Sequence, residues 1–143
     1  MSCTAFKLRF GVIGTNFVSD WLLEGAVEDP RFEVAAIYSR SQDTANAFAE
    51  KYNIPHTFIS LEKMASSPLI DAVYIASPTA LHSEQAILFM EHGKHVLCEK
   101  PSASNVRELS RMIETAKKYD VVFMEAMKLT LMPGFKAVLQ HLP

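Results

Sequence analysis

Short apolar segments alternate with amphipathic segments along the chain, and this alternation is the feature that most constrains the fold. Residues 70–77 are apolar after the first two positions, which is typical of a strand with both faces covered. Residues 105–118 instead carry apolar side chains at helical spacing, and Asn105 with Glu108 forms a capping pattern at the start. Strands that alternate with helices predict an α/β fold, a doubly wound parallel sheet with right-handed crossovers.

The same periodicities locate the other elements. The expected strands cover residues 7–13, 32–38, 70–77, 94–98 and 121–125, with a short segment at 56–59 and a helical turn at 61–65 between them. The expected helices cover residues 16–27, 42–52, 79–91 and 105–118, and another helix begins near Pro133. The helix at 105–118 has one apolar stripe, made of Val106, Leu109, Met112, Ile113 and Ala116.

Length, composition and charge fit one globular domain. The chain has 143 residues, and 14 basic against 16 acidic residues give a net charge of −2, without the basic surface of a nucleic-acid-binding protein. No apolar run approaches the ~20 residues of a membrane span. Cys3 and Cys98 match no metal-ligand spacing, and two isolated thiols favour a reducing compartment. We therefore expect a cytoplasmic protein with no metal, nucleic-acid or membrane partner.

A strand, a glycine turn and a helix follow one another over residues 7–27. Such a turn resembles the G-x-G-x-x-G pattern, in which the helix N-terminus offers N–H groups to a pyrophosphate. Gly14 holds the first glycine position, Asn16 the second and Ser19 the third, where a small side chain still packs closely. Asparagine tolerates left-handed backbone angles, and its amide is able to donate to a phosphate. The expected pyrophosphate contacts are Gly14, Thr15, Asn16 and Phe17; the alternative is an ordinary turn without a ligand.

The end of the second expected strand bears on the choice of cofactor. An NAD-binding domain usually has an acid there for the ribose 2′-hydroxyl, but this chain has Ser39 and Arg40 and no acid before Asp43. A hydroxyl and a guanidinium suit a 2′-phosphate better, because arginine forms charge-assisted hydrogen bonds with it. Ser39 and Arg40 therefore predict NADP(H), with NAD as the second choice. The alternative is a capping serine beside a surface arginine.

Three later motifs carry a resemblance to a known family. They are Ala76-Ser77-Pro78-Thr79 with His82, the segment Gly93-Lys94-His95-Val96-Leu97-Cys98-Glu99-Lys100-Pro101, and Phe123-Met124-Glu125-Ala126-Met127. Together with the spacing from the glycine turn, they resemble the Gfo/Idh/MocA family of glucose–fructose oxidoreductase and inositol dehydrogenase. Within it the chain looks most similar to the branch that includes dihydrodiol dehydrogenases.

The resemblance implies a nicotinamide-dependent oxidoreductase. Its members transfer a hydride between the cofactor and a secondary alcohol of a sugar, polyol or dihydrodiol, so the implied partner is a small carbohydrate-like substrate. The lysine that matches Lys100 lies near the substrate hydroxyl, and the peptide bond before the matching proline is commonly cis. The residues implied to lie along the cofactor are Ser77, Pro78, Thr79, His82, Glu99 and Lys100.

The position of Lys100 agrees with this implication. It follows a predicted parallel strand, at the edge where open α/β sheets place their ligands. Partly desolvated beside a nicotinamide, its amine would suit the transfer of a hydroxyl proton. Glu99 either orients this ammonium or points elsewhere, because adjacent strand residues face opposite sides.

Two functions remain open. Members of the family are more than twice as long, which implies a dinucleotide-binding domain over residues 1–125 and, over residues 126–143, the start of a connection to a second α/β domain. That domain supplies much of the substrate pocket and usually the oligomer interface, so a homo-oligomer is compatible with the full-length protein. The first function is the cofactor domain of an oxidoreductase; the second is a non-catalytic nucleotide-binding module or sensor.

Overall fold

The computed structural model, which describes residues 7–26 and 28–141, contains one parallel sheet of six strands. The strand order is β3-β2-β1-β4-β5-β6, and every neighbouring pair is parallel. This order confirms the predicted doubly wound α/β fold. The strands are β1 (Leu8–Ile13), β2 (Phe32–Tyr38), β3 (His56–Phe58), β4 (Ala72–Ile75), β5 (His95–Cys98) and β6 (Phe123–Glu125).

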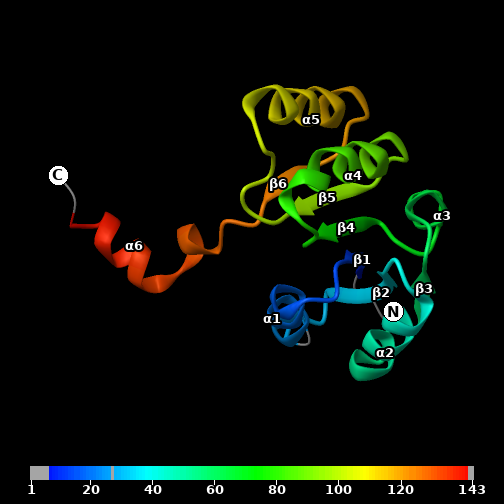
Figure 1. Ribbon diagram of the computed structural model, residues 1–143. Helices are drawn as coiled ribbons and strands as arrows, with labels where there is room; N and C mark the ends of the chain where they lie inside the picture. The colour runs from blue at the N-terminus through cyan, green and yellow to red at the C-terminus, as the bar shows by residue number, and fades with distance from the viewer. Residues whose placement is uncertain (1–6, 27, 142–143) are drawn as a thin grey trace, which may run out of the picture.

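Helices cover both faces of the sheet. Figure 1 shows α4 and α5 on one side and α1 and α2 on the other. Phe89 of α4 and Met112 of α5 are buried in one cluster, whereas Leu23 of α1 and Phe48 of α2 are buried in the other. The helices are α1 (Phe17–Ala26), α2 (Gln42–Tyr52), α3 (Leu61–Ala65), α4 (Thr79–Glu91), α5 (Val106–Lys118), the 3-10 helix η1 (Lys128–Leu131) and α6 (Pro133–Leu139).

Side-chain caps fix the starts of α2 and α5, as the sequence predicts. Ser41 Oγ accepts from the amide of Thr44 at 3.5 Å. Asn105 Oδ1 accepts from the amide of Glu108 at 3.0 Å, while the Glu108 carboxylate accepts from Ser104 N and Asn105 Nδ2. These bonds satisfy N–H groups that the first turn of a helix leaves without a backbone partner.

The order of the strands creates a crevice at one edge of the sheet. Strand β1 lies at the centre, and Ile13 at its carboxyl end pairs with Tyr38 of β2 on one side and Ile75 of β4 on the other. The chain leaves β1 toward one half of the sheet and later returns to β4 in the other half. In open α/β sheets ligands bind outside the carboxyl ends of the strands at such a reversal.

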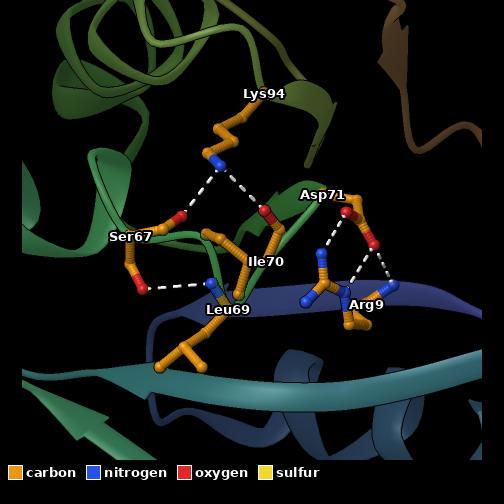
Figure 2. A network of polar contacts seen from close by, with 6 residues as sticks. All are labelled: Arg9, Ser67, Leu69, Ile70, Asp71 and Lys94. Carbon is orange, nitrogen blue, oxygen red and sulfur yellow. Dashed lines mark hydrogen bonds and ion pairs between the residues drawn. The ribbon is translucent and has the colours of Figure 1, made fainter.

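A network of polar contacts closes the opposite, amino edge of the sheet (Figure 2). Arg9 Nε and Nη2 donate to the Asp71 carboxylate at 2.9 and 2.6 Å, and the amide of Arg9 donates to it as well. The Lys94 ammonium donates to the carbonyls of Ser67 and Ile70 at 2.8 and 2.9 Å. Hydrogen bonding to Arg9 lowers the pKa of Asp71, and burial lowers the pKa of Lys94. These cations are bonded within the fold and stabilise the starts of β1, β4 and β5.

Strand β4 and helix α5 differ most from the prediction. Strand β4 has four residues rather than the eight predicted, because its pairing with β1 runs only from Phe10 opposite Ala72 to Ile13 opposite Ile75. The apolar stripe of α5 is only partly buried: Met112 and Ala116 are covered, whereas Val106, Leu109 and Ile113 are 79%, 37% and 40% exposed. The helix packs on α4 and β6 along one part of the stripe, so periodicity alone overestimates its burial.

The segment after β6 leaves the sheet and extends away from it (Figure 1). The apolar side chains of α6, namely Phe135, Val138 and Leu139, are exposed. One contact of this segment reaches back to α1, where Lys128 Nζ lies 4.6 Å from the centre of the Trp21 ring. No helix in the described ranges combines the length and the apolar character needed to cross a membrane.

Candidate functional site

A groove of about 640 Å³ lies at the carboxyl edge of the sheet, where the strand order reverses. It is lined by the ends of β1, β2 and β4 and by the starts of α2 and α4. Seven of the predicted cofactor residues line it: Gly14, Thr15, Asn16, Ser39, Arg40, Ser77 and Pro78. The other predicted residues, Phe17, Thr79, His82, Glu99 and Lys100, lie outside its lining.

Gly14 brings the first turn against the end of β4. Its φ angle is +110°, which L side chains rarely adopt, and a Cβ atom there would lie 2.7 Å from the carbonyl oxygen of Ala76. Both facts require glycine at this position. The turn therefore has the tight geometry that the sequence predicts for a phosphate-binding turn.

Asn16 braces this turn in place of a second glycine. Its Nδ2 donates to the carbonyl of Ala76 at 2.7 Å, and its Oδ1 accepts from the amide of Val18 at 2.9 Å. The side chain therefore caps α1 and joins the turn to β4. Within the described residues the amide N–H of Phe17 has no hydrogen-bond partner, so the N-terminus of α1 keeps a donor for an anion.

Ser19 fills the third glycine position as predicted. It is completely buried, and its hydroxyl donates to the carbonyl of Gly14 at 2.8 Å. This bond fixes the first turn of α1 against the end of β1.

The end of β2 presents an arginine to the groove. Ser39 is held by its amide, which donates to the carbonyl of Phe58 at 3.1 Å. Arg40 is exposed and has neither an ion pair nor a side-chain hydrogen bond with any described residue. Arg31, by contrast, is paired with Asp29 at 2.7 Å. The guanidinium of Arg40 is therefore available to an anionic ligand.

The end of β4 forms the opposite wall. Ser77 Oγ donates to Gln85 Oε1 at 2.6 Å, which fixes the serine against α4. Pro78 precedes the first residue of α4, Thr79, and its carbonyl accepts from the amide of Leu81 at 2.9 Å. Gln85 also lines the groove, but it is not among the site residues predicted from the sequence. Its role is to accept the hydrogen bond from Ser77, eight residues earlier in the chain, and the sequence gives no signal for this bond.

His82 lies beneath the wall rather than on it. The ring is 1% exposed, with Nε2 at 2.8 Å from the carbonyl oxygen of Ser77 and Nδ1 at 3.0 Å from that of Pro101. Carbonyl oxygens only accept, so the ring donates to both at once only when both nitrogens carry a proton. The predicted contact of His82 with a cofactor stays a prediction; the structure shows a link between two backbone segments.

Lys100 lies in a turn after β5, next to a proline. The Lys100–Pro101 peptide bond is cis, as the resemblance implies. The Lys100 side chain is exposed, so the described residues do not provide the desolvation expected from the sequence. Its Nζ makes no hydrogen bond with them either.

Glu99 turns away from the Lys100 ammonium. Its Oε1 accepts from the Tyr74 hydroxyl at 2.7 Å, and its Oε2 accepts from the amide of Lys100 at 3.2 Å. Burial, together with the bond to Glu99, raises the pKa of Tyr74, so this phenol remains a donor. Glu99 thus fixes the backbone of the turn. Of the two orientations considered from the sequence, the structure shows the one in which Glu99 does not orient the Lys100 ammonium.

Glu125, at the end of β6, holds the other side of the turn. Its Oε1 accepts from both the amide and the hydroxyl of Ser102 at 3.0 Å. Tyr74 and Glu125 were not among the predicted site residues, although Glu125 lies in a motif that carries the resemblance. Cys98 beneath the turn is fully buried, and burial raises its pKa to about 12, so it is a thiol without nucleophilic character.

Comparison with known proteins identifies the family. A model described as an oxidoreductase family with an NAD-binding Rossmann fold matches residues 8–127. The chain belongs to the Gfo/Idh/MocA oxidoreductase family. The match includes the glycine turn, the groove and the Lys100 turn, so the described fold is an NAD(P)-binding Rossmann domain.

Similar proteins include several named dehydrogenases. Scyllo-inositol 2-dehydrogenase (NADP(+)) IolU of Bacillus subtilis is 56% identical over 94% of this chain and 41% of its own length. Trans-1,2-dihydrobenzene-1,2-diol dehydrogenase of Danio rerio is 40% identical over 89% of this chain and 39% of its own length. The chain therefore spans about two fifths of the length of these relatives.

A solved structure shows the same arrangement. KijD10, a 3-ketoreductase from Actinomadura kijaniata in complex with NADP and TDP-benzene, superposes with a TM-score of 0.88 at 29% identity. The likeness covers 94% of this chain and 41% of that one. The described fold therefore matches about two fifths of that longer 3-ketoreductase.

Proposed function

We propose that the groove binds NADP(H). The turn from Gly14 to Phe17 would hold the pyrophosphate, and Ser39 with Arg40 would hold the ribose 2′-phosphate. The observation that carries this choice is Arg40, an exposed guanidinium at the end of β2 without a partner among the described residues. The required glycine at position 14 supports the pyrophosphate end, and so does the amide of Phe17, which has no hydrogen-bond partner among the described residues.

In this proposal the protein oxidises a secondary alcohol of a polyol, a sugar or a dihydrodiol, or reduces the corresponding ketone. A bound nicotinamide supplies or accepts the hydride. Lys100 Nζ takes the hydroxyl proton during oxidation and returns it during reduction. Its exposure after β5 leaves the amine accessible to a substrate, and the names of IolU and KijD10 support this substrate class.

The organisation of the complete protein belongs to the same proposal. Residues 1–125 form the dinucleotide-binding domain, and residues 126–143 begin the connection to a substrate domain. In this proposal the location is cytoplasmic, because two isolated cysteines suit a reducing compartment. A homo-oligomer is compatible with the full-length protein, because the second domain of family members usually supplies the oligomer interface.

A fluorescence titration of the chain with NADPH and with NADH tests the cofactor. Trp21, the single tryptophan, follows the turn by one helical turn and is 57% exposed, so a bound reduced nicotinamide should quench it. We expect saturable binding of both cofactors with NADPH preferred. A folded chain that binds neither would contradict the proposal, and equal affinities would remove the role of Arg40.

The reaction is tested in a form of the protein that extends over the length of its relatives. Reduction of NADP⁺ in the presence of scyllo-inositol, followed by the absorbance of the NADPH that forms, would be compared with that in the presence of other polyols. Turnover of at least one secondary alcohol is expected. Tight cofactor binding without turnover of any of them would favour the non-catalytic nucleotide-binding module.

A further inference from the structure

His82 joins two backbone segments that are far apart in the chain. It lies five residues after Ser77 and nineteen residues before Pro101, and it contacts both carbonyl oxygens. Ser77 lines the groove, and Pro101 is the residue next to Lys100. The ring therefore connects the wall of the cofactor groove with the turn that carries the proposed proton-transfer residue.

The other contacts of this turn do not make the same connection. Glu99 is bonded to Tyr74, and Glu125 is bonded to Ser102, so these carboxylates fix the two flanks of the turn to β4 and β6. Only the contact with His82, among those described, bonds the turn to α4. Loss of the imidazole would leave the flanks in place and release the carbonyl of Pro101.

We propose that His82 is the positioning residue that sets the place of Lys100 relative to the groove. The contact of Nδ1 with the carbonyl of Pro101 holds the turn, and the contact of Nε2 with the carbonyl of Ser77 holds the ring at the groove wall. The ring is 1% exposed and both nitrogens face backbone carbonyls, so it acts through the backbone and not by contact with a ligand. The inference rests on the proposed function of Lys100.

Two near-isosteric variants separate the two contacts. An asparagine amide ends near the position of Nδ1, so His82→Asn keeps a donor for Pro101. A glutamine amide ends near the position of Nε2, so His82→Gln keeps a donor for Ser77 only. His82→Phe retains the ring but has no donor. His92→Gln is the matched control, because His92 Nδ1 also contacts a backbone carbonyl, that of Leu88 at 2.8 Å, at the far end of the same helix.

The position of Lys100 can be followed directly in the chain by labelling its lysines with ¹³C-methyl groups and recording NMR spectra. Lys100→Arg assigns the Lys100 signal, and Lys94 at the opposite edge reports whether the fold is intact. We expect His82→Gln and His82→Phe to shift the Lys100 signal, with Lys94 unchanged. His82→Asn and His92→Gln should leave both signals in place.

Turnover in the longer form of the protein provides the second measurement. A misplaced Lys100 lowers kcat for the alcohol by up to about 100-fold, with an unchanged KM for NADP⁺, because the groove itself is intact. An unchanged Lys100 signal in both His82→Gln and His82→Phe would overturn the proposal. So would an effect of His82→Asn as large as that of His82→Phe.

The two proposals fail separately. If Lys100→Met leaves turnover unchanged while His82→Gln still shifts the Lys100 signal, the proton-transfer role is wrong and the positioning role stands. If Lys100→Met abolishes turnover while the His82 variants leave the signal unchanged, the positioning role is wrong. The NMR measurement needs no substrate, so it does not depend on the identity of the alcohol.

Discussion

The two edges of the sheet use their charged residues in opposite ways. At the amino edge Arg9 is bonded to Asp71, and Lys94 is bonded to two backbone carbonyls. At the carboxyl edge Arg40 and Lys100 are exposed and have no such bonds with the described residues. The backbone there is held instead by side chains such as Asn16 and Glu99. One edge therefore uses its cations for stability, and the other keeps them accessible for ligands.

The largest expected effect concerns Lys100. In a form as long as the relatives, Lys100→Met should lower turnover of the alcohol by about 10²–10⁴-fold, because the proton-transfer group is lost. The affinity for NADPH should change little, since Lys100 lies outside the lining of the groove. Lys63→Met, on the exposed part of α3, is the control. Equal activity of Lys100→Met and the control would remove Lys100 from the reaction.

Gly14→Ala tests whether the carboxyl edge needs its close contact with β4. The φ angle of +110° and the 2.7 Å approach to Ala76 should destabilise the fold by about 1–3 kcal/mol and weaken NADPH binding. Urea unfolding and the fluorescence titration measure the two effects. Gly134→Ala in α6 is the control, because a Cβ there would meet nothing within 4 Å. Similar results for both variants would show that the turn tolerates a side chain.

Arg40→Ala tests whether the exposed cation recognises the 2′-phosphate. Loss of a charge-assisted contact should weaken NADPH binding by about 1.5–3 kcal/mol, roughly 10- to 100-fold, and leave NADH binding unchanged. Comparative titrations with the two cofactors measure this difference. Arg31→Ala, at an exposed arginine already paired with Asp29, should change neither affinity. A parallel loss for both cofactors would make Arg40 a structural residue.

The smallest effect is expected at the amino edge, where the contribution of Asp71 to stability depends on pH. Because hydrogen bonding to Arg9 lowers the pKa of Asp71 in the folded state, this carboxylate stabilises the fold above its unfolded pKa of about 3.9. That contribution is lost as the pH falls through the lowered folded pKa. Asp71→Asn should therefore reduce stability at neutral pH and flatten its decline below pH ~4. Thermal unfolding measured across this pH range checks the prediction, and the affinity for NADPH should not change. The same decline of stability in acid for the variant and the unaltered protein would contradict it.

The fold was predictable because its signals are local. Strand β2 and helices α2, α3 and α4 have the predicted bounds, since turns and caps such as Ser41 mark their ends. The ends of β4 were not predictable, because they depend on where pairing with β1 stops and where Asp71 bonds Arg9 instead. Long-range partners decide such boundaries, and a single sequence does not show them.

The candidate site was predictable in its outline. The glycine turn and the cations at the strand ends have local patterns, and the groove brings Gly14, Arg40 and Ser77 together. What the sequence did not show is the partner of each polar side chain. Asn16 was expected to face a phosphate and is bonded to Ala76, while the bond between Tyr74 and Glu99 joins residues 25 positions apart.

Strand β5 sets the distance between Lys94, which is bonded within the fold, and Lys100, the proposed proton-transfer residue. Lys94 anchors its start, Lys100 follows its end, and the strand between them has four residues. An insertion of one residue there would turn every later side chain of the strand to the opposite face and displace Lys100 by about 3.3 Å. An insertion after Lys128, where the chain is exposed, would leave that spacing intact. Engineering of loop lengths in this protein should therefore avoid residues 94–100 and use the segment after β6.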